Sequence, residues 1–201
     1  YTDKDKFDLI MMNPPFGGSE LPIIKQNFPT DLRSSETADL FLALIMYRIK
    51  DNGKVGVILP DGFLFGNDGA KLNIKKRMLK DFNLYTIIRL PGSIATNILF
   101  FDKTGPTKET WFYRLDMPKG YKHFSKTRPM KLKHFDPVRE WWNDRHEIQD
   151  EDGNYKSKAY TPEELAKNNY NFDLCGFPTE TEEVLPPFEL MDKYQKERKE
   201  L

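Results

Sequence analysis

Short, mainly apolar runs alternate along the first part of the chain with longer segments whose apolar residues recur at helical spacing. The runs at 7–12 and 54–60 are apolar on both faces, which is typical of buried parallel strands. Between them, residues 36–50 carry an apolar stripe at helical spacing and end at a stop signal, Asp51-Asn52-Gly53. The pattern therefore predicts a strand, a helix and a second strand.

The same alternation continues after residue 60. Glycines at 62, 66 and 69 lead into a helix over 70–81, and strands follow at 85–90 and 95–101. The link at 91–94 is too short for a parallel crossover, so we expect these two strands to pair antiparallel as a hairpin. With a short edge strand at 110–115, the pattern predicts an α/β sheet with helices on its faces.

The character of the chain changes after the last of these strands. Residues 119–158 are rich in charge, and helix signals return with a capping box that begins at Thr161. The tail from residue 187 has the pattern of a charged helix with a narrow apolar stripe, which favours packing against another subunit. We therefore divide the chain into a sheet-forming part, 1–118, and a mainly helical C-terminal extension, 119–201.

Composition narrows the class of protein. The chain is 38% hydrophobic and 31% charged, with a formal net charge of zero, so it does not by itself attract nucleic acid strongly. No apolar run is long enough to span a membrane, and the single cysteine, Cys175, cannot form an internal disulfide, which favours the cytoplasm. Because a buried strand begins only a few residues after Tyr1, we expect further sequence before it that covers the edge of this strand.

The tetrapeptide Asn13-Pro14-Pro15-Phe16 is the sharpest chemical feature, because it follows the first strand, where ligands bind in open α/β sheets. The Asn13 side-chain oxygen and the Pro14 carbonyl could accept hydrogen bonds from an adenine amino group and make its nitrogen more reactive. Pro15 restricts the backbone, and Phe16 offers a face for stacking on an extruded base, worth about 1–3 kcal/mol. Taken alone, the tetrapeptide is equally compatible with a simple turn after a strand.

The surrounding segments resemble the N6-adenine DNA methylase family, and in particular the modification subunits of type I restriction-modification systems. The resemblance covers roughly residues 5–175. It is carried by the tetrapeptide with its flanking residues and by the ordered segments Thr37-Ala38-Asp39-Leu40-Phe41-Leu42, Leu59-Pro60-Asp61-Gly62-Phe63-Leu64-Phe65-Gly66, Thr96-Asn97-Ile98-Leu99-Phe100-Phe101 and Asn168-Asn169-Tyr170-Asn171-Phe172.

This resemblance implies the class I S-adenosylmethionine-dependent methyltransferase fold. Residues 1–118 would be the C-terminal half of its catalytic domain, the second half of a mostly parallel sheet that ends in an antiparallel strand. The resemblance also implies transfer of a methyl group from S-adenosylmethionine to a flipped adenine, with Asn13, Pro14, Pro15 and Phe16 as catalytic residues and no metal. DNA and the specificity and restriction subunits of a type I system are the implied partners, and no membrane is involved. By their places in the family-like segments, Gly17, Asp39 and Asp61 are candidate pocket residues, although surface capping also explains both aspartates.

The chain departs from the family pattern in two places. The glycine-rich loop and the acidic residue that bind the donor lie upstream of the tetrapeptide in the family and cannot be placed here, so the cofactor-binding residues are unknown. The link at 91–94 is also shorter than the corresponding family segment.

Two other classes of function are considered beside this one. Methyltransferases that act on protein glutamine or on ribosomal RNA use Asn/Asp-Pro-Pro-Tyr, so Phe16 and the Leu59–Gly66 segment argue against them. A non-catalytic assembly module with the same fold would have no reason to keep the intact tetrapeptide.

Several further residues have simple explanations. The cationic side chains on the helix over 70–81 are expected to form a solvated face. The basic, aromatic stretch 119–134 is a better candidate than this helix for a DNA or partner surface, although a solvated surface is the favoured interpretation. Trp141-Trp142 is expected to anchor packing, and the three histidines lack the spacing of a zinc site.

Overall fold

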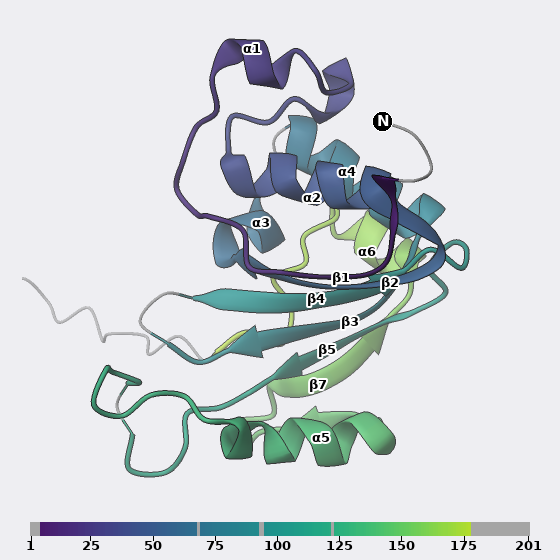
Figure 1. Ribbon diagram of the computed structural model, residues 1–201. Helices are drawn as coiled ribbons and strands as arrows, with labels where there is room; N and C mark the ends of the chain where they lie inside the picture. Colours follow the sequence, from purple (N-terminus) through teal and green to yellow (C-terminus); the bar gives the residue numbers. More distant parts are fainter. Residues whose placement is uncertain (1–4, 68, 93–94, 122, 178–201) are drawn as a thin grey trace, which may run out of the picture.

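The computed structural model describes residues 5–67, 69–92, 95–121 and 123–177. These ranges contain a sheet of seven strands in the order β1-β2-β4-β3-β5-β7-β6 (Figure 1). The strands are β1 (Phe7–Met12), β2 (Ile49–Pro60), β3 (Asn83–Leu90), β4 (Thr96–Asp102), β5 (Thr110–Arg114), β6 (Ile148–Gln149) and β7 (Tyr155–Tyr160).

The pairing of these strands sets the direction of the sheet. β1 runs parallel to β2, and β3 runs parallel to β5. β4 lies between β2 and β3 and is antiparallel to both, which confirms the predicted hairpin. The prediction that 110–115 forms an edge strand is wrong, because β7 pairs with the outer side of β5.

Helices cover both faces of the sheet (Figure 1). One face carries α2 (Thr37–Arg48), α3 (Asp61–Phe65), α4 (Gly69–Asp81) and α6 (Pro162–Lys167), and the other carries α5 (Asp136–Asn143). The larger core lies under the first group, around residues such as Leu42, Val57 and Phe101. On the other face, Trp141 of α5 packs among Tyr113, Ile88 and their neighbours, so the predicted role of the tryptophan pair as a packing anchor is confirmed.

Three short elements complete the described fold. They are the helix α1 (Pro22–Lys25) and the 3-10 helices η2 (Thr30–Leu32) and η3 (Leu132–Phe135). α1 lies at the end of a long excursion away from the sheet, between β1 and α2 (Figure 1). Its residue Ile23 is two-thirds exposed, at 66%.

Two predictions about the first half of the chain need correction. The helix α2 ends at Arg48, before the predicted stop signal, and β2 already begins at Ile49. The signal lies inside this strand, where Asn52 adopts a φ of 62° and its N–H donates to the Lys103 carbonyl. The chain thus turns locally at Asn52, but the sheet continues through it.

The first strand is parallel, as predicted, but it is not buried within this chain. β1 forms one edge of the sheet, and Phe7, Leu9 and Met11 are 50%, 60% and 79% exposed. Only Ile10 of this strand is buried. Within the described residues, β1 therefore presents an unpaired backbone edge and exposed apolar side chains, the features through which an edge strand pairs with other segments.

The segment after residue 118 contributes more to the sheet than its composition predicts. It supplies α6, as the capping box predicts, and also α5, β6 and β7, of which the two strands extend the sheet beyond β5. The Thr161 capping box is confirmed, because the Thr161 N–H donates to Glu164 Oε2 at 2.8 Å and the Glu164 N–H donates to Thr161 Oγ1. The helix expected after residue 187 lies outside the described residues, and the division at residue 118 stays a prediction.

No helix in the described ranges is long and apolar enough to cross a membrane.

Candidate active site at the carboxyl edge of the sheet

One edge of the sheet gathers the ends of four neighbouring strands. β1 and β2 are parallel and in register at Met12 and Val57, so Asn13 and Asp61 leave the sheet at the same edge. The antiparallel β4 begins there, with Asn97 opposite both Leu59 and Arg89. This is the edge at which ligands bind in open α/β sheets.

The predicted catalytic tetrapeptide lies at this edge, immediately after β1. Pro14 is buried, whereas Asn13 and Pro15 are exposed. Within the described part of the chain, the Asn13 side chain makes no hydrogen bond, so its amide oxygen can accept one from a substrate. Phe16 is half-buried and packs against the main core, which fixes the ring while leaving part of it accessible.

The backbone after the tetrapeptide is constrained by two glycines. Gly17 has a φ of +72°, a conformation that favours glycine, and a Cβ built on it would meet no atom within 4 Å. The Gly18 carbonyl accepts a hydrogen bond from the N–H of Thr37, at the start of α2, and a Cβ on Gly18 would lie 2.8 Å from Thr37 Oγ1. The tetrapeptide is therefore followed by open space at Gly17 and is tied at Gly18 to the beginning of α2.

Asp39 lies in the first turn of α2 but not on the surface, so capping does not explain it. Its side chain is buried, and Oδ2 accepts a 2.6 Å hydrogen bond from Ser34 Oγ and lies 3.1 Å from Lys71 Nζ. Oδ1 is buried without a hydrogen-bond partner among the described residues. Burial raises the pKa of Asp39, although Ser34 and Lys71 both oppose this shift.

Lys71 joins this carboxylate to a second one on the surface. Its ammonium group donates to Glu36 Oε1 at 2.6 Å, while its side chain is only 3% exposed. Burial lowers the pKa of Lys71, but the hydrogen bond from Lys71 to Glu36 and the attraction of Asp39 outweigh burial and raise it. The cluster fixes α4 to the start of α2, and Asp39 is thus a structural neighbour of the tetrapeptide loop; its place in a pocket stays a prediction.

Asp61 begins α3 at the end of β2 and is held from three directions. Its N–H donates to the Ala95 carbonyl at 3.1 Å. Asn97 Nδ2 donates to Asp61 Oδ1 and Arg89 Nη2 to Oδ2, each at 2.6 Å. Arg89 also donates through Nη1 to Asp173, far along the sequence. Asp61 therefore belongs to a polar network beside the tetrapeptide.

Sequence patterns did not identify Arg89, Asn97 or the buried Lys75 as parts of this edge. The prediction of a solvated cationic helix face is wrong for Lys71 and Lys75, which are 2% and 0% exposed. Lys75 Nζ donates to the carbonyls of Leu64 and Gly66 at the end of α3, and to that of Tyr170 at 3.0 Å. The family-like segments Leu59–Gly66 and Asn168–Phe172 are thereby joined around one ammonium group.

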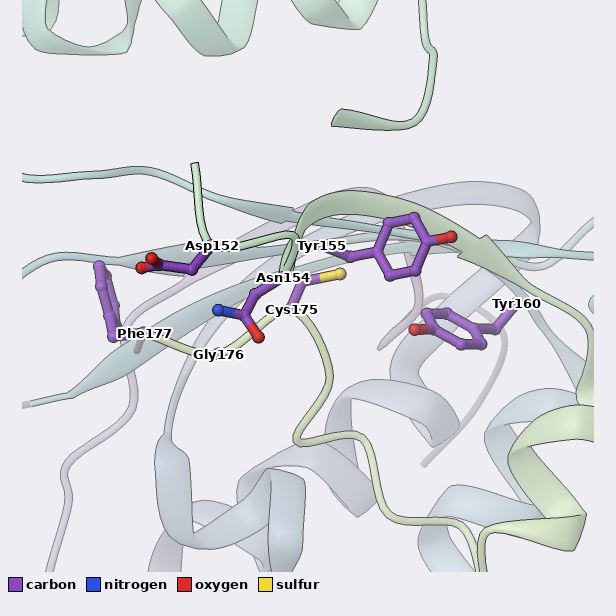
Figure 2. Close-up of a pocket in the computed structure, with 7 residues that line it drawn as sticks. All are labelled: Asp152, Asn154, Tyr155, Tyr160, Cys175, Gly176 and Phe177. Atoms are coloured by element: carbon purple, nitrogen blue, oxygen red, sulfur yellow. The ribbon is translucent and has the colours of Figure 1, made fainter. Parts of the chain in front are cut away.

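A cavity of about 500 Å³ lies elsewhere, beside β7 (Figure 2). Figure 2 shows the Tyr155 and Tyr160 rings and the Cys175 side chain at one end, with Asp152 and Phe177 at the other. The strands β2, β4, β3 and β5 separate β7 from β1, a distance of roughly 24 Å at the usual strand spacing. This cavity is thus distinct from the surface around Asn13. No group of side chains that could hold a metal ion occurs in the described ranges.

An open mixed sheet with helices on both faces and an Asn-Pro-Pro-Phe motif at its carboxyl edge is the architecture of the class I methyltransferase fold. The family is established by sequence, because residues 1–184 match the N-6 DNA Methylase family, and the chain belongs to it.

Individual members of type I restriction systems are similar to this chain in sequence and in structure. The chain is 41% identical to the Type I restriction enzyme EcoEI methylase subunit of Escherichia coli, over 98% of this chain and 42% of that protein. A crystal structure of a modification subunit of a putative type I restriction enzyme from Vibrio vulnificus is similar with a TM-score of 0.75 and 41% identity, over 82% of this chain and 36% of that one.

A structure from work on complex assembly and conformational transition of the type I R-M system matches with a TM-score of 0.76 and 33% identity, over 98% of this chain and 43% of that one. These likenesses confirm the predicted class I S-adenosylmethionine-dependent methyltransferase fold. The chain spans about two fifths of the length of the curated relative, at 42%.

Proposed function

We propose that this chain carries the adenine-binding side of a DNA adenine N6-methyltransferase, in the modification subunit of a type I restriction-modification system. The observation that supports this most directly is the exposed Asn13 side chain at the carboxyl edge of the sheet, which has no hydrogen-bond partner among the described residues and is followed by a buried Pro14 and a half-buried Phe16. Membership of the N-6 DNA Methylase family and the likeness to type I methylase subunits support the same substrate.

The reaction requires a poor nucleophile to be made reactive. The lone pair of an adenine amino group is delocalised into the ring, and hydrogen bonds from its two N–H groups to fixed acceptors favour a more tetrahedral nitrogen. The Asn13 side-chain oxygen and the Pro14 carbonyl are the two acceptors, because Asn13 has no competing partner within the described residues and Pro14 is held by its burial. The exposed part of the Phe16 ring is the surface on which the extruded base stacks.

The methyl donor is S-adenosylmethionine, which supplies a methyl group already activated for displacement. The residues present fit its reacting end: the surface beside Asn13 is open, and a Cβ at Gly17 would meet nothing within 4 Å. Asn13 and Phe16 hold the adenine against this open surface, so alignment of the nitrogen with the methyl group provides most of the rate gain. No strong general base is needed for this step, and none of the described residues is assigned to the adenosine part of the donor.

DNA binding and sequence choice depend on partners in this account. The chain has a formal net charge of zero, so phosphate attraction by this part alone is weak. A specificity subunit that selects the target sequence and a restriction subunit are the partners proposed for it, by analogy with the type I methylase subunits to which it is similar. A cytoplasmic location is proposed on the same analogy.

Substrate profiling tests this proposal. The full-length protein, with the specificity subunit encoded beside it, is incubated with labelled S-adenosylmethionine and either unmethylated DNA, ribosomal RNA or a glutamine-containing release-factor peptide. We expect the label in N6-methyladenine of DNA alone. Label in RNA or in the peptide would leave the fold intact but overturn the substrate, and no transfer to any of the three would favour a non-catalytic assembly module.

A further inference from the structure

The carboxyl edge contains an arginine whose role goes beyond the family motifs. Arg89 lies at the end of β3, is 6% exposed, and bonds two carboxylates at once: Asp61 at the end of β2 and Asp173 in the C-terminal segment. These partners are 28 and 84 residues away in the sequence. Arg89 therefore joins a residue beside the tetrapeptide to a segment from the far end of the described chain.

The Asp61 carboxylate is held by a separate donor at each of its two oxygens. Each of its carboxylate oxygens accepts one 2.6 Å hydrogen bond, from Arg89 on one side and from Asn97 on the other. Asn97 is fully buried, at 0% exposure. It lies opposite Arg89 in the β3–β4 pairing, so the sheet fixes the positions of these two donor residues relative to each other. A charge-assisted contact of this kind holds a carboxylate in one orientation.

Besides Asp61, Arg89 contacts the segment 168–173 through Asp173. This segment is already fixed to α3 by the Phe172 N–H, which donates to the Leu64 carbonyl at 2.9 Å, and by Lys75, which binds the Tyr170 carbonyl. Phe172 is fully buried beneath it. Asp173 follows directly, so docking of this segment delivers a carboxylate to Arg89 and completes the network at Asp61.

We propose that Arg89 is a positioning residue of the methyl-transfer site, which holds Asp61 and the turn after β2 beside the Asn13 tetrapeptide while Asp173 is docked against it. This inference rests on the proposed function. β1 and β2 are neighbours that end at the same edge of the sheet, with Met12 opposite Val57, so the turn at Asp61 follows the strand beside the tetrapeptide. A shift of this turn would therefore move one wall of the surface that receives the base. Misplacement of a reacting group by about 1 Å can lower a rate by roughly a hundredfold.

Arg114 provides a matched control. It occupies the register position beside Arg89 in the parallel pair β3–β5, and its side chain is similarly buried, at 3% exposed. Its guanidinium bonds Asp116, Asp150 and the Gly176 carbonyl, and within the described ranges it makes no hydrogen bond to Asp61. Loss of Arg114 thus removes a buried arginine that also bonds two carboxylates, without releasing the turn after β2.

The experiment measures kcat, KM for DNA, and donor affinity by calorimetry for the full-length protein with its specificity subunit. The variants are Arg89→Met, Arg89→Lys, Asp173→Asn, the double variant Arg89→Met with Asp173→Asn, and Arg114→Met. We expect Arg89→Met to lower kcat by at least about tenfold with little change in donor affinity, Arg89→Lys to recover part of the loss, and Arg114→Met to keep kcat within about threefold.

The double variant tests whether Asp173 acts on the site through Arg89. Asp173→Asn should lower kcat several-fold when Arg89 is present and have no further effect in the Arg89→Met background, because the coupling acts through Arg89. Additive losses, or equal losses in Arg89→Met and Arg114→Met, would overturn the inference and leave a purely structural role. Asp173 is 40% exposed, so this variant folds even if Arg89→Met does not. A wild-type protein without DNA methylation would instead contradict the proposed function itself.

Discussion

Lys75 offers the most demanding test of how the edge is assembled. Replacing it by methionine keeps most of the side-chain volume but removes the ammonium group that bonds the Leu64, Gly66 and Tyr170 carbonyls at 2.6, 2.9 and 3.0 Å. The Leu64 carbonyl keeps the Phe172 N–H as a donor, but the Gly66 and Tyr170 carbonyls lose the ammonium group. Each buried acceptor left without its donor costs about 1–3 kcal/mol, and relief from burying a charge offsets part of the sum. We expect a net loss of about 2–4 kcal/mol in the stability with which segment 168–173 is held against α3.

Hydrogen exchange followed by mass spectrometry measures this directly. A loss of that size corresponds to roughly 30- to 1000-fold faster exchange of the amides in segment 168–173 and at the end of α3, because about 1.4 kcal/mol changes an equilibrium constant tenfold. Lys80→Met is the control, since Lys80 is exposed on the same helix. Exchange in the Lys75→Met variant within threefold of the wild type would refute the role assigned to this ammonium group.

Two smaller predictions follow from local geometry. Thr161→Ala removes the capping box of α6 and should destabilise the segment by about 1 kcal/mol, seen as faster exchange confined to residues 162–167; an unchanged rate there would contradict the cap. Burial raises the pKa of the Cys175 thiol to about 12, so it is almost wholly the unreactive thiol at neutral pH. Iodoacetamide at pH 8 should therefore modify it slowly in the native protein and rapidly after unfolding in urea, and fast native modification would show that the segment around it is open.

Much of the sheet could be predicted because its strands are short apolar runs bounded by turn residues. The prediction that β5 is an edge strand was wrong because β7, the strand beyond it, could not be recognised. The β7 sequence Tyr155–Tyr160 contains two lysines and does not resemble a core strand. In the fold, Lys158 Nζ lies 4.0 Å from the centre of the Tyr155 ring and 5.4 Å from that of Tyr160, so its charge is accommodated over aromatic faces. A hydropathy pattern cannot predict this contact between a lysine and two aromatic rings.

The candidate site was predictable only where a local motif carries the chemistry. Asn13 to Phe16 are adjacent in sequence, and their position after a strand follows from the apolar run before them. The burial of Lys71 and Lys75 was not predictable, because isolated lysines on a helix are normally solvated and their partners come from other elements. Arg89 depends on a partner 84 residues away, which no spacing rule connects to it.

The central claim is that Asn13 accepts hydrogen bonds from the adenine that is methylated. Its most direct test compares Asn13→Ala with Asn143→Ala, an exposed asparagine on α5 at the opposite face of the sheet, by transfer of labelled methyl to unmethylated DNA and nucleoside analysis. We predict that Asn13→Ala lowers the rate of N6-methyladenine formation by about a hundredfold or more while donor binding and folding are retained, and that Asn143→Ala keeps the wild-type rate. An Asn13→Ala protein that methylates adenine at close to the wild-type rate would contradict the account.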